Sequence, residues 1–394
     1  MRVGFVVAAL GVGGVAHAAG FAIGEQSTVA AGTGGASTAR DDDAGAAWYN
    51  PAALADGGGV RVGVGVVIAA PRIEASGEDA AGAWTASSGG VSPLPSIHAS
   101  WARGKLALGL SAGVPFGGNV RWPDGWAGAN EIVASKLEVV RIAPFAAYAV
   151  GAWRVGGGVH VDLARITLER GLDFVDAAGE VGITMGGVGV GLDLSAWRRV
   201  GAVDLGLTYK SRTAISLEGD ADFEAPGAFD QKLMDQGAHT EITLPDRIAL
   251  GARWRRGAVA LLGDVELTAW GVNDHLEVAF DREDTPHALQ QNDWTTTLAV
   301  RGGVELGRGR WVGRVGGFYD PTPTQDDARA PSSPDSSRVG ATVGGSARLA
   351  RAWVIDASYG YTHLLGADNT GMESITASYA GRAHMLGLAV RFTR

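Results

Sequence analysis

Three side chains of the kind used in nucleophilic catalysis, His160, Asp162 and Ser195, occur within one part of the chain. A hydrolase needs a nucleophile, a base and a group that orients the base, all near one opening of the fold. Here the three residues fall in ordinary alternating segments, with no Gly-x-Ser-x-Gly turn around the serine. The sequence therefore predicts that the protein is not an enzyme, and an enzyme acting on lipids is the less favoured alternative.

A second group with possible chemistry is the acidic run Asp41, Asp42 and Asp43. Three adjacent carboxylates cannot all turn their oxygens toward one ion, and no EF-hand spacing follows them. Solvated side chains or a helix cap explain the run better than a metal site does. The chain has no cysteine, which removes thiolate metal ligands and thiol nucleophiles. We therefore expect neither a metal nor another cofactor.

The N-terminus indicates export. Met1 and Arg2 precede an apolar run from Val3 to Val15, and Ala16-His17-Ala18 places small residues where signal peptidase reads them. We predict a signal peptide over residues 1–18, because the run is shorter than the roughly 20 residues of a membrane helix. The net charge of −9 argues against a nucleic-acid partner.

From Val60 onward, apolar residues alternate with polar or small ones, which is the pattern of β-strands. For example, Val62, Val64 and Val66 share one face of a strand, whereas Gly63 and Gly65 share the other. The runs predict about fourteen strands, an even number as in bacterial outer-membrane barrels. They cover residues 60–70, 95–103, 105–115, 137–150, 152–169, 186–197, 200–217, 240–255, 257–273, 293–307, 309–319, 337–349, 351–364 and 381–393.

The connections between these runs alternate between short and long. Short periplasmic turns and longer outer loops are typical of an outer-membrane barrel. The short connections lie near Gly104, Gly151, Arg198-Arg199, 255–257, 307–309 and Ala350, and the long ones cover 71–94, 116–136, 170–185, 218–239, 274–292, 320–336 and 365–380. A soluble protein of several sheets is disfavoured, because the face opposite the apolar one carries charged and polar residues in many strands.

Aromatic residues near the strand ends suit the girdles that such barrels place at the two membrane interfaces. They are Trp101, Trp153, Trp197, Tyr209, Trp254, Trp270, Trp294, Trp311, Trp353 and Tyr361. The fold class predicted is therefore an all-β transmembrane barrel.

The segment 19–59 shows no sustained alternation and is rich in Gly, Ala, Ser and Thr, so we expect short helical pieces and turns there. Its start, Ala19-Gly20-Phe21, and the stretch from Asp42-Asp43 to Asn50-Pro51-Ala52 resemble the FadL/TodX family of outer-membrane transporters for long-chain fatty acids and aromatic hydrocarbons. Shorter matches follow in order along most of the chain. They are Leu207-Thr208-Tyr209-Lys210-Ser211, Thr243-Leu244-Pro245 and Tyr319-Asp320-Pro321-Thr322-Pro323.

The resemblance implies a monomeric fourteen-stranded barrel over residues 60–394, plugged by a hatch formed by residues 19–59. Its partners would be a hydrophobic small molecule and the lipids of the bacterial outer membrane. Cargo would be captured outside and leave sideways, by passive diffusion, through a gap in the barrel wall. A general porin is the alternative, but an open pore needs no such plug.

The resemblance also implies roles for single residues. Phe21 and Arg170 would bind substrate, with Arg170 beside a carboxylate. The family's partner lysine has no counterpart, since residues 286–294 contain none and His287 is the nearby candidate. The segment with Gly113, Pro115, Phe116 and Gly117 is either a turn from strand to loop or the inward kink that opens the wall. Asn50-Pro51-Ala52 is either a plain turn or an anchor of the plug.

Overall fold

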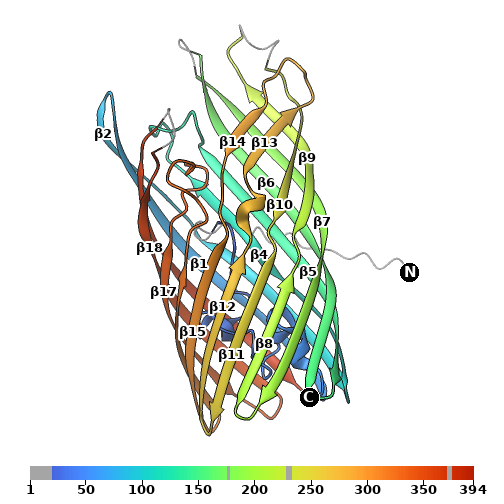
Figure 1. Ribbon diagram of the computed structural model, residues 1–394. Coiled ribbons are helices and arrows are strands. Elements are labelled where there is room, and N and C mark those ends of the chain that lie inside the picture. The colour runs from blue at the N-terminus through green and yellow to red at the C-terminus, as the bar shows by residue number, and fades with distance from the viewer. Residues whose placement is uncertain (1–19, 175–177, 228–232, 371–374) are drawn as a thin grey trace.

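The computed structural model describes residues 20–174, 178–227, 233–370 and 375–394, so the predicted signal peptide lies outside the described residues. The strands form a closed antiparallel barrel of fourteen strands around a lumen (Figure 1). The first and last strands close it, with pairs running from Arg61–Thr393 to Ser76–Ser378. The predicted fold class is therefore confirmed. No helix in the described part of the chain is long and apolar enough to cross a membrane.

Five of the wall strands are each interrupted once, which divides the wall into nineteen labelled segments. The interrupted strands are β2/β3, β8/β9, β10/β11, β12/β13 and β14/β15. The segments are β1 (Gly59–Asp79), β2 (Gly82–Gly89), β3 (Ser92–Arg103), β4 (Leu106–Arg121), β5 (Ala134–Val150), β6 (Trp153–Asp173), β7 (Ala178–Val200), β8 (Val203–Lys210), β9 (Thr213–Glu224), β10 (Gln236–Leu244), β11 (Arg247–Arg256), β12 (Val259–Thr268), β13 (His275–Phe280), β14 (Ala288–Gln291), β15 (Thr297–Arg308), β16 (Trp311–Asp320), β17 (Arg338–Arg348), β18 (Trp353–Asp368) and β19 (Ser378–Thr393).

Several strands extend well beyond the predicted ranges at their outer ends. The region 71–94, predicted as a loop, is largely a hairpin of β1 with β2, paired from Arg72–Gly89 to Asp79–Gly82. Strand pairing does not require an apolar face, so sequence alternation can fade while the hydrogen-bonded ladder continues.

Turns at the other end of the barrel are tight and use glycines with positive φ, at Gly104, Gly151, Gly201, Gly257 and Gly309. The turn predicted at Arg198-Arg199 instead lies at Gly201, because β7 continues to Val200.

The outer face of the barrel is apolar, as contact with lipid requires. Val188, Leu250 and Leu388 each expose more than half of their surface. Trp101, Trp153, Trp311 and Trp353 also point outward, as predicted for girdle residues. The prediction is wrong for three tryptophans, Trp197, Trp270 and Trp294, which are buried inside.

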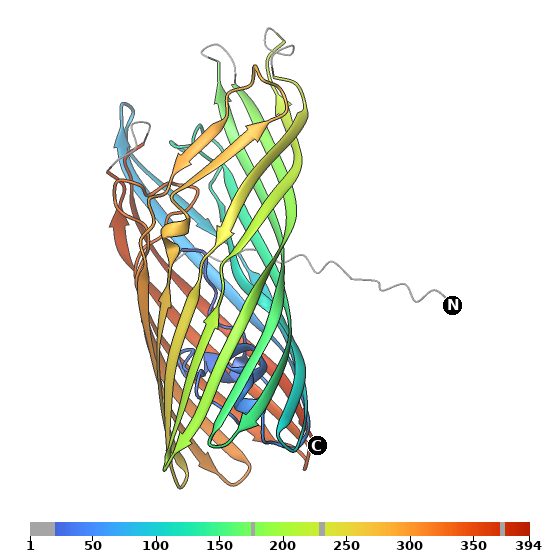
Figure 2. The same ribbon diagram turned by 45° about the vertical axis from the view of Figure 1, so that its right-hand side comes forward.

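The N-terminal segment lies within the lower half of the barrel, where Figure 2 shows it in blue. It contains three one-turn helices, α1 (Thr28–Ala31), α2 (Ala46–Tyr49) and the 3-10 helix η1 (Pro51–Leu54). Ser27 caps α1 by accepting a hydrogen bond from the Val29 amide. Ala46, Ala52 and Leu54 pack on Phe145 and Trp197 of the wall. Such short helices are not stable alone, so packing in the lumen must hold them.

Candidate functional site

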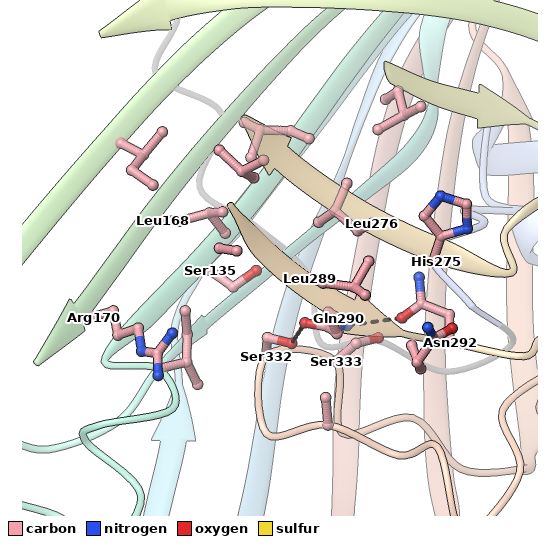
Figure 3. A pocket seen from close by; sticks show the side chains of 18 of the residues that line it. Ser135, Leu168, Arg170, His275, Leu276, Leu289, Gln290, Asn292, Ser332 and Ser333 are labelled. Atoms are coloured by element: carbon pink, nitrogen blue, oxygen red, sulfur yellow. Dashed lines mark hydrogen bonds between the residues drawn. The ribbon is translucent and has the colours of Figure 1, made fainter. Parts of the chain in front are cut away.

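A cavity of about 1050 Å³ occupies the outer part of the lumen. One wall consists of apolar side chains of β5, β6 and β7, including Leu137, Ile166 and Ile183. The hairpin of β13 and β14 covers the other side, and Figure 3 shows Leu276 and Leu289 on it, opposite Leu168. An apolar cavity with a few polar groups at its edge is typical of a ligand site.

The basic and imidazole side chains that line the cavity are Lys136, Arg170, His275 and His287. Arg170 lies near Leu168, and both belong to β6 (Figure 3). The Arg170 Nε donates to the Asn130 carbonyl at 2.5 Å. His287 Nδ1 lies 2.7 Å from a Glu277 carboxylate oxygen. Lys136 also lines the cavity, with its ammonium 2.9 Å from Glu138. Arg170 and His287 were singled out from the sequence, whereas Lys136 was missed.

The floor of the cavity is aromatic and joins the hatch to the wall. Phe21 packs edge-on against Trp270, with ring centroids 4.8 Å apart, and against Phe116 at 5.7 Å. Trp294 completes the group at 5.3 Å from Phe21. Trp270 reaches the lumen because the 3-10 helix η2 (Trp270–Val272) interrupts the strand between β12 and β13. The structure thus places Phe21, a predicted substrate-binding residue, directly beneath the cavity.

The residue before Phe21 is held equally closely. Gly20 has φ +63°, and a Cβ there would lie 2.7 Å from the Trp270 ring. Its amide donates to Asp335 at 3.0 Å, and Asp335 also accepts from the Thr322 hydroxyl. Burial raises the pKa of Asp335 to about 6, although both hydrogen bonds act in the opposite direction.

Strand β4 is irregular at the segment Gly113 to Gly117. Gly113 pairs with Arg141 of β5, and the next pair is Phe116 with Val139. Between these two pairs β4 has two residues and β5 has one, so β4 carries one extra residue, a β-bulge. In the described residues, β4 pairs with β3 only up to Ile97–Ala112. A turn from strand to loop is therefore wrong here, since β4 continues to Arg121.

Beyond Ala112, the backbone of β4 bonds to the hatch instead of to β3. Gln26 bonds the Val114 backbone twice, accepting from its amide at 2.9 Å and donating to its carbonyl at 2.6 Å. The Ile23 amide donates to Pro115 and the Gly117 amide to Phe21, each at 2.9 Å. A Cβ on Gly113 would lie 2.4 Å from Gln26 Oε1, so a larger residue here would have to displace the Gln26 side chain from its bonds to Val114.

The acidic run of the hatch forms ion pairs with the barrel wall. Asp41 and Asp42 accept from Arg199 and Arg253, each at 2.7 Å. Asp43 is buried, accepts from Ser27 at 3.1 Å, and does not cap α2, whose N-cap is Gly45. The prediction of a solvated run therefore holds for Asp42, which is exposed, but is wrong for the buried Asp43, and α2 has no side-chain cap. In the described part of the chain, no group of three or more acidic or His side chains is arranged to hold a metal.

One carboxylate joins this network around three arginines. Glu305 of β15 accepts from Arg40 at 2.9 Å, Arg253 at 2.9 Å and Arg314 at 2.6 Å, and all four side chains are buried. Burial alone would lower the pKa of Arg40, but the nearby carboxylates, Glu305 first, outweigh it and raise that pKa. Buried charges persist only when paired, so this network fastens the hatch inside the barrel.

The Asn50-Pro51-Ala52 stretch makes both local and wall contacts. Asn50 donates to the Thr38 carbonyl at 2.8 Å and to the Ala196 carbonyl of β7 at 3.1 Å. Pro51 is the first residue of η1, a position suited to its missing amide. The Ala52 amide donates to Ser195 at 3.1 Å.

The three residues considered for catalysis do not form a triad, because His160 Nε2 lies 3.7 Å from Asp162 Oδ2 whereas Ser195 bonds elsewhere. His160 lies 3.0 Å from Asp193 and 2.9 Å from Thr213, whereas Asp162 receives two bonds of 2.8 Å from Arg141. The Ser195 hydroxyl instead accepts a hydrogen bond from the Ala52 amide of the hatch. In the described part of the chain, these contacts join neighbouring wall strands and hold the hatch, and they do not follow the Ser–His–Asp order of a triad.

A closed barrel with an apolar outer face and an N-terminal segment inside its lumen defines this protein as an outer-membrane barrel. The model of the family described as outer membrane protein transport protein (OMPP1/FadL/TodX) matches residues 9–393, and the chain belongs to this family. The family contains transporters rather than enzymes, and its members reside in the bacterial outer membrane.

Individual relatives are distant in sequence but similar in fold. An outer membrane protein of Neisseria meningitidis serogroup B (NMB0088) is 22% identical, with 94% of each chain covered. A FadL homologue of Pseudomonas aeruginosa matches with a TM-score of 0.87 at 18% identity, covering 94% of this chain and 99% of its own. The toluene transporter TodX of Pseudomonas putida matches with a TM-score of 0.76 at 17% identity, covering 93% and 97%.

Proposed function

We propose that this protein lets small hydrophobic molecules, long-chain fatty acids or similar lipids and hydrocarbons, cross the outer membrane by passive diffusion. The observation that carries the proposal is the apolar cavity whose floor residue, Phe21, touches the kinked strand β4 at Phe116. Moving an alkyl chain from water into such a cavity gains about 0.8 kcal/mol per buried methylene. That gain is kept if the molecule then leaves into lipid.

The proposed route leads sideways. Below the cavity, the hatch and its ion pairs fill the lumen. In the wall beside Phe21, β4 is no longer paired with β3, and its backbone bonds to the hatch instead. Displacement of Phe21 by cargo would therefore free the Phe116 segment and open a passage between β3 and β4. Gly113, Pro115, Phe116 and Gly117 form the proposed lateral opening.

The polar edge of the cavity bears on the choice of cargo. Arg170 uses Nε for the Asn130 carbonyl, which leaves its terminal nitrogens to meet a carboxylate. His287 stands where a second cation would be expected, but it is close to Glu277. We therefore propose fatty acids held by one arginine, with uncharged hydrocarbons bound by the same apolar wall. Among the similar structures, CymD and TodX are described as monoaromatic hydrocarbon channels.

Removing the extra residue of β4 tests the lateral route. Deletion of Pro115 should restore regular pairing with β5 and straighten the strand. We expect uptake of radiolabelled fatty acid, by cells that lack their own transporter, to fall about tenfold or more, as a barrier of about 1.4 kcal/mol would produce. Binding of the acid in detergent should persist.

A second irregularity offers a matched control. Between Leu364 and Ala367, β18 also carries one extra residue relative to β19. Deletion of Gly366 should regularise that strand and leave uptake near the wild-type rate. Wild-type uptake by a folded Pro115-deletion barrel would exclude exit between β3 and β4.

A further inference from the structure

A second interruption of the wall lies beside the cavity, on the side away from β4. Strands β11 and β12 pair without a break from Arg256–Val259 up to Arg247–Thr268. Above them, the described pairs between β10 and β13 are only Ala238–Phe280 and His239–Ala279. Figure 1 shows β13 and β14 as a separate hairpin above η2. The ladder is therefore missing over residues 240–245 of one wall strand and 270–278 of the next.

The sequence itself explains why pairing stops at this place. Continuing the register from His239–Ala279 would put Glu241 directly opposite Glu277, and like charges at opposed positions destabilise a strand pair. Thr240 instead donates its hydroxyl to the Glu277 carbonyl at 2.6 Å. Lower down, Pro245 has no amide to donate, and η2 turns the facing chain away. The Ala269 amide bonds to Asp246 at 2.9 Å and marks the lower edge of the gap.

The cavity reaches this gap. Its lining includes three consecutive residues of β10, Glu241, Ile242 and Thr243. Side chains of successive strand residues point to opposite faces, and here Ile242 is buried while Glu241 is exposed. Across the gap the lining continues through Asn273, Asp274, His275 and Leu276. The cavity lining therefore includes residues on both sides of the interval in which β10 and β13 are unpaired.

The gap lies just above the lipid-facing band. On β11 the outward residues Ile248 and Leu250 are apolar and exposed. On β10 the outward positions are Thr243, Glu241 and His239, which are polar. A change from apolar to polar on the outer surface marks the level of the lipid head groups.

We infer that the gap between β10 and β13 is a side port, through which hydrophobic molecules dissolved in the outer leaflet reach the cavity. This inference rests on the proposed function and names the route by which cargo arrives. A molecule that partitions into lipid would slide from the head-group level past Glu241 and Leu276 without returning to water. The port and the β3–β4 opening would then give one protein two lateral passages, one for loading and one for release.

Reversible cross-linking tests the port. The chain has no cysteine, so Glu241→Cys with Glu277→Cys introduces a single reactive pair across the gap. A bifunctional methanethiosulfonate reagent would tie the two strands, and a reductant would release them. We expect cross-linking to slow uptake of a radiolabelled long-chain fatty acid about tenfold relative to the same variant before treatment. Reductant should restore the rate.

Two comparisons make the result decisive. Leu250→Cys with Val265→Cys places the same linker across a paired, lipid-facing position of the intact wall, where uptake should not respond. An unchanged rate in the fully cross-linked Glu241/Glu277 variant would overturn the port. Binding of the same acid to the wild-type protein in detergent tests the proposed function separately, since a protein that binds no acid would fail there first.

Discussion

The main-chain amide of Gly20 donates a hydrogen bond of 3.0 Å to the carboxylate of Asp335, which is 315 positions away in the chain. Asp335 belongs to the connection between β16 and β17 and is buried. Because Phe21 follows Gly20, this bond fixes the aromatic floor of the cavity to an outer loop. A substitution at Asp335 should therefore alter the position of Phe21 in the cavity floor.

The raised pKa of Asp335 predicts a specific pH dependence of stability. The folded chain favours the protonated carboxyl, so this contribution is complete below about pH 4 and is lost as the pH rises through about 6. Over that window, the wild type should lose on the order of 3 kcal/mol of unfolding free energy relative to Asp335→Asn, which cannot titrate. Urea unfolding in detergent, followed by tryptophan fluorescence at several pH values, measures the difference.

The exposed Asp124 supplies the control for this experiment. Asp124→Asn should follow the wild-type pH dependence, because no buried contact is removed. Parallel curves for the wild type and Asp335→Asn would show that folding does not raise the pKa of Asp335.

The cluster around Glu305 predicts a leak when its carboxylate is neutralised. Glu305→Gln leaves Arg40, Arg253 and Arg314 crowded without their shared anion, a loss that typically costs about 3–5 kcal/mol in a buried site. We expect lower stability and larger ion currents through single barrels in planar bilayers, because the hatch loses one of its attachments to the wall. Glu74→Gln, in an exposed pair with Arg72, should change stability by less than about 1 kcal/mol and leave the current unchanged.

Truncation of the cavity floor should weaken ligand binding. Phe21→Ala removes the ring that contacts Phe116, Trp270 and Trp294, and burial of an aromatic side chain is worth roughly 2 kcal/mol. We expect fatty-acid affinity in detergent to fall about thirtyfold. Phe392→Ala removes a ring that packs on Trp353 outside the lumen and should not affect affinity. Equal affinities for both variants would exclude Phe21 from the site.

Sequence periodicity predicted the strands well because one face of each strand must meet lipid. In this alternation Trp197 falls on the opposite face of β7 from the outward Leu194. The sequence therefore indicated that Trp197 points inward, although the interpretation as a girdle residue overlooked it. Trp270 and Trp294 were not readable, since they lie in η2 and a connection, where period two does not apply. The partners of Glu305 and Asp335 come from distant segments, and only the closed barrel brings them together.

The edge of the cavity distinguishes acids from neutral cargo. In the described part of the chain, the Arg170 side chain bonds to Asn130 and is exposed, so its attraction for a carboxylate should be modest. We expect Arg170→Gln to lower the affinity for a long-chain fatty acid about fivefold, near the upper limit for exposed charge pairs, and to leave the affinity for its methyl ester unchanged. Lys136→Gln is the matched control, because Lys136 lines the cavity but pairs with Glu138, so its loss should matter less for the acid. Titrations of the acid and the ester against each variant measure these affinities. If Arg170→Gln weakened both ligands equally, the arginine would act through packing, and hydrocarbons would become the better-supported cargo.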